Sequence, residues 1–334
     1  MQRFFDEINQ SLDKSISQKD LKPISNILNR TKGENKDKID LLLFSALQKP
    51  ITSEILKLIL EFGVNINSRN SQIPLHVALE NKKSLSIIKL LIEYESDLFI
   101  TDNETPLHTA CKSCVDFDII KLLVDSGSDI HAITNEEPIH LACCPNPNND
   151  TILFLIEKGA NIHLKDENLP FHYAVQNGAS LKVIEFLYNN LQEKLTEEEI
   201  DKLFLLNCQK YPSGDSLEFL LKLGAKYDNS QSKTPIQYLC MNNRSLEAIK
   251  VLIKWGFSVN SDNSSEPPLF LAFRNINCLE TLNLLIDSGA NIETESKNVL
   301  DIACQMKSSF PIFRRLILSG AKEPKRNNVK FFIL

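Results

Sequence analysis

Two pairs of cysteines are the strongest candidates in this sequence for a metal-binding or catalytic site. Cys111-x-x-Cys114 and Cys143-Cys144 together have a spacing that is typical of zinc ligands, although no histidine follows at a ligand spacing. Thiolates bind zinc directly, and a cysteine of lowered pKa can act as a nucleophile or a redox group. These four residues define one alternative function: an enzyme or metal-binding protein that uses a cysteine site.

Four histidines form a second candidate array, because His76, His108, His140 and His172 are spaced 32 residues apart. Packed helices lie about 8–10 Å apart, whereas metal ligands lie about 2 Å from the ion. If each histidine belongs to its own structural unit, neighbouring imidazoles are therefore too far apart to share a metal. We expect no metal site from this array.

Other catalytic and cofactor-binding motifs are missing from the sequence. It contains no nucleophile elbow, P-loop, His-Glu-x-x-His motif or glycine-rich phosphate loop. The 37 Lys and Arg against 43 Asp and Glu give a formal charge of −6, which argues against a general nucleic-acid binder. We therefore predict a non-catalytic protein with no cofactor and no nucleic-acid partner.

The histidines belong to a repeat that runs along most of the chain. Pro74, Pro106, Pro138 and Pro170 are each 32 residues apart, and weaker copies follow the same period at 42–46, 203–207, 235–239, 268–272 and 299–303. A proline suits the first position of a helix. Seven of the ten glycines, at positions 63, 127, 159, 224, 256, 289 and 320, follow an apolar run of helical period, which is typical of a helix end.

Each unit is thus predicted to be a helix started by proline, a short turn, a second helix that ends at glycine, and a polar hairpin-like loop. Segments such as Thr105-Pro106-Leu107-His108-Thr109-Ala110 make the sequence resemble the ankyrin-repeat family, whose unit of about 33 residues carries Thr-Pro-Leu-His-x-Ala. The resemblance covers about residues 39–324 and implies an all-α solenoid of stacked helix-turn-helix units. It also implies that each histidine bonds the loop backbone of its own or the next unit.

The domain organisation follows from this period. We expect an N-terminal helical cap at 1–38, about nine repeats at 39–324 and a C-terminal tail at 325–334. The solenoid is expected to be irregular near 187–206, because the glycine is missing there and Thr196 with Glu199 forms a capping box. That box predicts extra helix near 192–206. The tail, which ends in Phe331-Phe332-Ile333-Leu334, either caps the last unit or binds a partner.

The resemblance implies that a protein partner meets the loop tips and the exposed side of the first helices. A further clue is the residue before the terminal glycine, which is polar in some units but is aromatic at Phe62 and Trp255, with Tyr94 at the matching place. Aromatic anchors are common in binding hot spots. The candidate partner-binding residues are Trp255, Tyr94, Phe62, Arg69, Asn103, Glu136, Glu167, Lys112, Gln176, Met241 and Arg274.

The predicted function is a protein-interaction scaffold or adaptor. Alternatives are the cysteine-based enzyme or metal protein, and a host-directed effector of a parasite or intracellular bacterium, since the richness in Asn, Lys, Ile and Ser is typical of a low-GC genome. The first seven residues lack the apolar core of a signal peptide, and no run is long enough to span a bilayer. We therefore expect a monomer with reduced thiols, in the cytoplasm or the nucleus, that is not inserted in a membrane.

Overall fold

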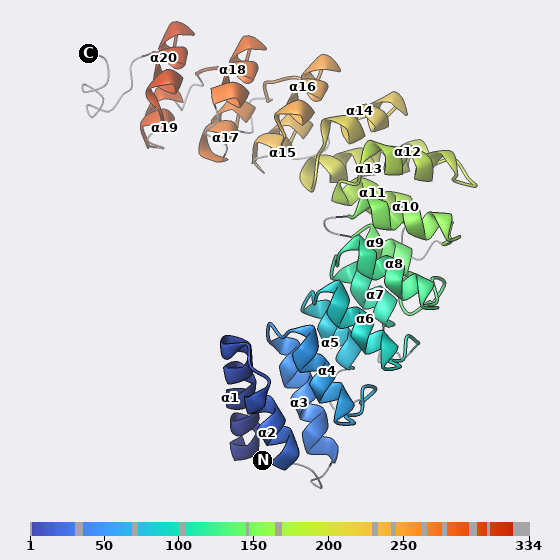
Figure 1. The fold of residues 1–334 in the computed structure, drawn as a ribbon. Coiled ribbons are helices and arrows are strands. Elements are labelled where there is room, and N and C mark those ends of the chain that lie inside the picture. The colour runs from blue at the N-terminus through green and yellow to red at the C-terminus, as the bar shows by residue number, and fades with distance from the viewer. Residues whose placement is uncertain are drawn as a thin grey trace. The chain divides into compact units, whose positions relative to one another are not determined.

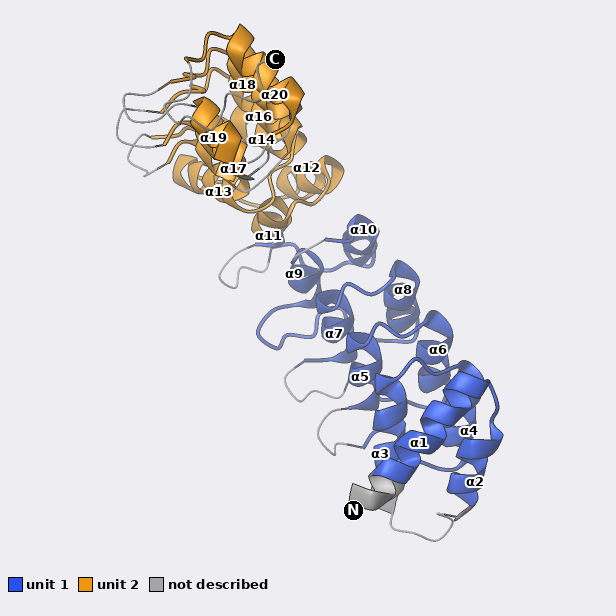
Figure 2. Ribbon diagram, turned by 90° about the vertical axis from the view of Figure 1, so that its left-hand side faces the viewer, with its two compact units in different colours: residues 1–170 blue, residues 171–334 orange. Residues whose placement is uncertain are grey.

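Every regular element in the part of the chain that the structure describes is a helix, as expected. The computed structural model describes residues 2–30, 36–68, 73–99, 104–144, 147–163, 169–228, 233–241, 245–261, 266–275, 279–293, 299–305 and 308–322. These ranges contain twenty helices, α1–α20 (Figure 1). In the same ranges, no helix has both the length and the apolar character needed to cross a membrane. The chain divides into two compact units, residues 1–170 and 171–334 (Figure 2).

Unit 1 consists of two rows of helices. The first helices of successive repeats pack on one another, and so do the second helices. The first helices are α3 (Lys36–Gln48), α5 (Pro74–Glu80), α7 (Pro106–Lys112) and α9 (Pro138–Ala142); the second helices are α4 (Ser53–Glu61), α6 (Leu85–Glu93), α8 (Phe117–Asp125) and α10 (Asn149–Glu157). Ahead of them, α1 (Gln2–Gln18) and α2 (Lys22–Arg30) pack on α3 and α4 as a further helical pair.

Unit 2 repeats this arrangement. Its first helices are α11 (Pro170–Asn177), which starts at the unit boundary, α13 (Glu197–Gln209), α15 (Pro235–Met241), α17 (Pro268–Asn275) and α19 (Val299–Gln305). Its second helices are α12 (Leu181–Asn189), α14 (Gly214–Lys222), α16 (Leu246–Lys254), α18 (Leu279–Asp287) and α20 (Phe310–Leu318). Neighbouring second helices pack in sequence from α12 to α20.

The core lies between successive repeats because a single helical pair cannot bury its own apolar face. The alanine of each signature segment is buried where two first helices meet, as at Ala78, Ala110 and Ala272. A small side chain here lets adjacent helices approach closely. Branched residues such as Ile88 and Leu123 fill the space between first and second helices and are fully buried.

The irregular segment in unit 2 is only partly as predicted. Thr196 and Glu199 do form a capping box: the Glu199 backbone N–H donates to Thr196 Oγ1 and the Thr196 N–H donates to Glu199 Oε2. The extra helix, however, begins at Glu197 and not near 192, because the capping residue must itself lie outside the helix. The added turns belong to α13, which extends to Gln209.

Side chains also join successive repeats through the loop backbone. Asn67 Nδ2 donates to the Glu95 carbonyl (3.0 Å), and the Asp97 N–H donates to Asn67 Oδ1 (2.8 Å). Asn260 makes the same pair of bonds with the backbone of residues 289–291. At these two joints a single asparagine thus bonds a carbonyl and an N–H that follow the second helix of the next repeat.

The glycine that ends a second helix is required by its backbone angle. Gly127 has φ +100° and an added Cβ would meet nothing within 4 Å, so the only cost of a side chain is conformational. We expect Gly127→Ala to lower the free energy of unfolding in urea by about 1–2 kcal/mol. Its neighbour Ser126 has φ −85° and is exposed, so Ser126→Ala should change stability by less than about 0.5 kcal/mol. Equal losses in the two variants would contradict this explanation.

Candidate functional site

Four of the predicted contact residues occupy one register, six positions after the proline of the signature segment. Lys112, Gln176, Met241 and Arg274 lie in the last turns of α7, α11, α15 and α17. None of them is buried, and the Lys112 side chain is 60% exposed. We call this position the surface register. It is the place on each first helix where a side chain can change without disturbing the packing of the repeat.

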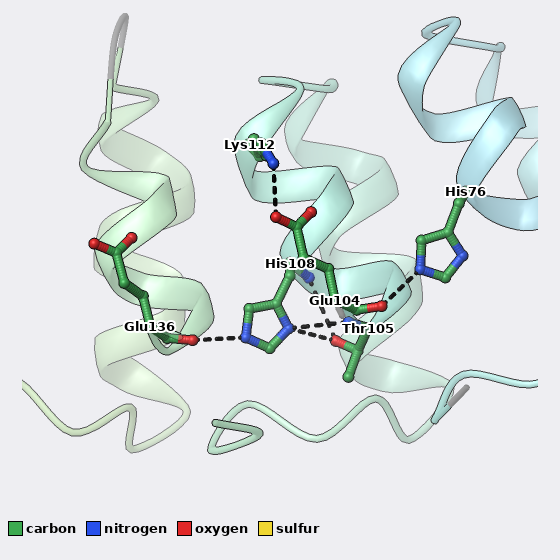
Figure 3. A network of polar contacts seen from close by, with 6 residues as sticks. All are labelled: His76, Glu104, Thr105, His108, Lys112 and Glu136. Carbon is green, nitrogen blue, oxygen red and sulfur yellow. Dashed lines mark hydrogen bonds and ion pairs between the residues drawn. The ribbon is translucent and has the colours of Figure 1, made fainter. Parts of the chain in front are cut away.

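Two residues of the surface register form the same ion pair in different units. Lys112 Nζ lies 2.6 Å from Glu104 Oε1, eight residues earlier, and Arg274 Nη1 lies 3.0 Å from Glu266 Oε2, again eight residues earlier (Figure 3 shows the first pair). Hydrogen bonding to Glu104 raises the pKa of Lys112. Both pairs are accessible to solvent, so each adds at most about 1 kcal/mol to stability. Their main effect is to hold a charged side chain across the exposed side of its helix.

Glu136, the loop-tip candidate that the structure describes, lies two residues before α9 and is half-buried. Its carbonyl oxygen accepts a hydrogen bond from His108 Nε2 (2.8 Å), just as the Glu104 carbonyl accepts one from His76 Nε2 (2.8 Å; Figure 3). At these two positions the structure confirms that the imidazole bonds the loop backbone of the next unit. The histidine array is therefore structural where its contacts are described.

The tautomer of His108 follows from its two partners. A carbonyl can only accept, so Nε2 carries the proton that goes to Glu136, while Nδ1 accepts from the Thr105 N–H (3.3 Å). Thr105 Oγ1 also lies 2.7 Å from Nδ1. The His108 backbone N–H donates to Thr105 Oγ1, which together with the bond from the Thr105 N–H forms a capping box on α7. Burial lowers the pKa of His108 below its ordinary value, so the ring is held neutral.

A glutamine takes over this role in unit 2. Gln237 occupies the histidine position of α15, and its Nε2 donates to the Glu266 carbonyl (2.7 Å). Its Oε1 accepts from the Thr234 N–H (2.6 Å), as Nδ1 of the imidazole does. The loss of the histidine from the later units therefore need not break the joint between repeats.

The three aromatic candidates lie elsewhere. Phe62, Tyr94 and Trp255 are the residues that terminate the second helices α4, α6 and α16. Trp255 is 42% exposed, whereas Phe62 and Tyr94 are half-buried. The two helices of a repeat are joined by a short turn and run antiparallel, so the aromatic residues and the surface register lie at opposite ends of the helical pairs. The structure does not bring them together in one cluster.

Three further candidates and one segment lie outside the described residues: Arg69, Asn103, Glu167 and the tail from 325 to 334. Conversely, the structure adds residues that the sequence patterns did not single out. Glu104 and Glu266 hold the basic side chains of the surface register, and Phe99 and Ile133 expose 63% and 64% of their surface on loops of unit 1. A recurring glutamate eight residues before a basic residue is the signal that could have revealed the pairs.

The cysteine cluster is divided by burial. Cys111 and Cys143 are buried where α7 packs on α9, and burial raises the pKa of both thiols well above its ordinary value. Cys114 and Cys144 are partly exposed. Within the described ranges, no three His, Cys, Asp or Glu side chains come together in a group that could hold a metal ion. A raised pKa opposes the thiolate that metal binding and nucleophilic attack need.

The role of His108 can be tested by two substitutions. His108→Gln should keep both hydrogen bonds and lie within about 0.5 kcal/mol of the wild type at pH 7.5, whereas His108→Leu should lose roughly 1–3 kcal/mol because it leaves the Glu136 carbonyl and the Thr105 N–H without this partner. Urea unfolding gives both values. A leucine variant as stable as the glutamine variant would contradict the assigned hydrogen bonds.

The lowered pKa of His108 also predicts a pH dependence. The unfolded chain takes up the proton near the ordinary pKa of 6.5, before the folded chain does. The contribution of this residue is therefore complete above pH 6.5 and is lost as the pH falls from 6.5 toward the lower folded pKa. In urea unfolding between pH 7.5 and 5, the wild type should lose more stability than His108→Gln, which cannot titrate there. Identical pH profiles would contradict this assignment.

Thiol labelling distinguishes the packing role from a metal site. With iodoacetamide at pH 8 we expect Cys114 and Cys144 to react at least about tenfold faster than Cys111 and Cys143, because only thiolates react and burial disfavours them. Peptide mass spectrometry measures each rate, and a urea-denatured sample is the control in which all four react. Stoichiometric zinc by elemental analysis, with all four cysteines protected until a chelator is added, would instead support the metal alternative.

Comparison with known proteins agrees with the geometry of the repeats. A model of ankyrin repeats, comprising three copies, matches residues 42–134, 115–198 and 205–296. A search among curated proteins found no match. The matched segments cover well over half of the sequence and contain the helical pairs and glycine ends described above. The chain therefore belongs to the ankyrin-repeat family.

Proposed function

We propose that this protein is a non-catalytic scaffold or adaptor that binds a partner protein along the loop tips and the exposed side of its first helices. Ankyrin repeats are generally modules of protein–protein interaction. The residues proposed to contact the partner are those of the surface register together with the exposed side chains of the adjoining loops. Trp255 is a separate candidate anchor on the second-helix side of unit 2.

The observation that carries this proposal is the difference between the buried positions of the first helices and the surface register. Most buried positions of the first helices stay small or apolar from repeat to repeat, whereas the surface register varies among polar, charged and apolar residues and is not buried in any described repeat. A partner can therefore be recognised without any change in the packing. The residues of this register are Gln48, Glu80, Lys112, Gln176, Gln209, Met241, Arg274 and Gln305 on the first helices, and Cys144, which lies two residues after the end of α9.

Exposed apolar side chains support the same proposal in unit 1. Phe99 follows α6 and Ile133 precedes α9, and each exposes more than half of its surface. Apolar anchors surrounded by polar groups are typical of binding hot spots. In unit 2, Trp255 supplies the aromatic anchor beside Lys254, which is paired with Glu218.

The remaining assignments complete the proposal. Residues 1–38 serve as an N-terminal cap, 39–324 carry the nine repeats, and 325–334 form the C-terminal tail. Ser15 supports the cap, since its buried hydroxyl accepts the Ile24 N–H (3.2 Å) and so fixes α1 to α2. The protein acts as a monomer in the cytoplasm or nucleus and has neither a cofactor nor a nucleic-acid partner.

The binding surface can be tested by charge reversal. The full-length protein, tagged at one end, is used to capture partners from its native organism, and the captured proteins are quantified by mass spectrometry. Lys112→Glu combined with Arg274→Glu should reduce the yield of specific partners at least tenfold, since each change breaks an ion pair and repels the partner's complementary groups. Trp255→Ala tests the separate anchor in the same way.

Matched control variants show whether any loss is specific to the proposed surface. Lys89 and Lys250 lie on the second helices α6 and α16, are 63% and 48% exposed, and are also paired with a glutamate. Lys89→Glu combined with Lys250→Glu should leave the yield unchanged. Equal recovery by all variants, or equal loss in the control, would show that the partner binds another face.

A further inference from the structure

The last helix of the described chain presents apolar side chains to solvent. On α20, Phe310 is 63% exposed, Ile317 is 44% exposed and Leu318 is 72% exposed. Phe310 and Ile317 are seven residues apart and therefore share one face of the helix. The opposite face is packed: Ile312, Phe313 and Leu316 are buried. The exposed residues define what we call the terminal face.

Equivalent residues in earlier repeats show what this face normally contacts. The eighth position of every second helix is apolar, and it is buried or half-buried in all of them except α20. In α12 this position is Tyr188, whose ring meets Phe219 of the next repeat at 5.4 Å. The first position behaves likewise in α8, where Phe117 meets Phe154 of the next repeat at 5.5 Å. In α12 and α8 these positions thus pack on the following repeat, whereas the first position of α6, Leu85, stays 40% exposed.

The ninth position makes α20 unlike any other second helix. It is charged or amidic in the eight earlier helices and leucine only at the end, which is the reverse of the polar outer surface that a terminal repeat needs for solubility. The residues at this position are Glu61, Glu93, Asp125, Glu157, Asn189, Lys222, Lys254, Asp287 and Leu318.

The inner side of α20 packs on α18 and α19. Arg315 pairs with Asp287 of α18, and the Gly320 N–H closes the helix on the Ile317 carbonyl (3.0 Å). No repeat follows α20 within the described residues. A cover for the terminal face must therefore come from the rest of this chain or from another molecule.

The sequence beyond α20 contains a segment of the right chemistry. Phe331-Phe332-Ile333-Leu334 is entirely apolar and offers two aromatic rings, the type of side chain that Phe154 and Phe219 supply in the internal repeats. It begins nine residues after Lys322, the last described residue. Nine residues can span up to about 30 Å, more than the roughly 14 Å length of a nine-residue helix such as α20.

Charge argues against the alternative of a second copy on the same face. Arg314 is exposed and lies between Phe310 and Leu318 on the terminal face. In a twofold dimer the same patch meets itself, so the two Arg314 side chains would be brought together. Like charges in such a contact are unfavourable. The side chains of residues 331–334 are all apolar, so these side chains place no like charge against Arg314.

We propose that residues 331–334 of the same chain cover the terminal face of α20 and act as the C-terminal cap of the solenoid. Phe331 and Phe332 take the place of the ring that a following repeat would supply, against Phe310, Ile317 and Leu318. The tail is thus a part of the packed body of unit 2 and is not a ligand for another protein.

Photo-crosslinking tests this contact directly. Phe332 is replaced in the full-length protein by a benzophenone-bearing phenylalanine, and crosslinked peptides are identified after irradiation of the monomer fraction. We expect intramolecular crosslinks to residues 310–318, reduced at least fivefold by Leu318→Glu. The matched control, Leu85→Glu, changes another exposed leucine on a second helix of unit 1 and should leave the crosslinks unchanged.

Hydrogen exchange provides a second measurement that does not depend on the probe. Phe331→Ser with Phe332→Ser should speed exchange of the α20 amides about tenfold, Phe310→Ser should do the same, and all three changes together should add little. Crosslinks between two chains, crosslinks elsewhere in the protein, or unchanged exchange in α20 would each overturn the proposal. Since the partner-binding surface is formed by other residues, these outcomes leave the proposed adaptor function to its own test.

Discussion

Burial between neighbouring repeats is the constraint on which this structure depends. Each repeat has a first helix of mostly five to eight residues and a second helix of nine, and helices this short are not stable alone in water. Their apolar residues are covered only when another pair lies on each side, as the complete burial of Ala78, Ala110 and Leu123 shows. Stability is therefore distributed over a series of similar interfaces, and no single core holds the chain together.

The same constraint explains the polar groups at the joints. Stacking short helices buries many helix ends, whose backbone groups need partners. His76 and His108 supply a donor to the next loop, and Asn67 and Asn260 supply a donor and an acceptor. Gln237 shows that the requirement is for a side chain with a donor and an acceptor at suitable positions, and not for an imidazole. The regular histidines are consequently better explained by architecture than by catalysis.

In a stack of repeats, residue types can vary at positions that do not pack on a neighbour, whereas the exposed sides of the terminal repeats are restricted to residues that tolerate solvent. The surface register tolerates Lys112, Met241 and Arg274 alike because none of these side chains contributes to the packing between repeats. The ends of the stack have no such freedom, since a repeat there has one neighbour only. The apolar residues on the outer side of α20 are therefore more informative than a similar patch on an internal loop, because their equivalents Phe117 and Tyr188 contact aromatic rings of the following repeat.

Local signals made much of the fold predictable from the sequence. Three signals depend on residues within one helical turn of each other: the proline starts, the glycine ends and the Thr196–Glu199 capping box. The order of the helices and the all-α class therefore follow from the sequence. The predicted extra helix near 192–206 differs from α13, which begins at Glu197, directly after the capping residue Thr196. The predicted structural role is confirmed at His76 and His108, whose imidazoles bond the loop backbone of the next unit.

The tertiary structure, and not the sequence pattern, shows which side chains are accessible and which lie together. It separated Cys111 and Cys143, buried between two helices, from Cys114 and Cys144 at the surface. It paired Lys112 with Glu104, and it placed Trp255 at the other end of a helical pair from the surface register. Helix boundaries depend on the chain's own neighbours in sequence, whereas burial and pairing depend on what another repeat brings into contact.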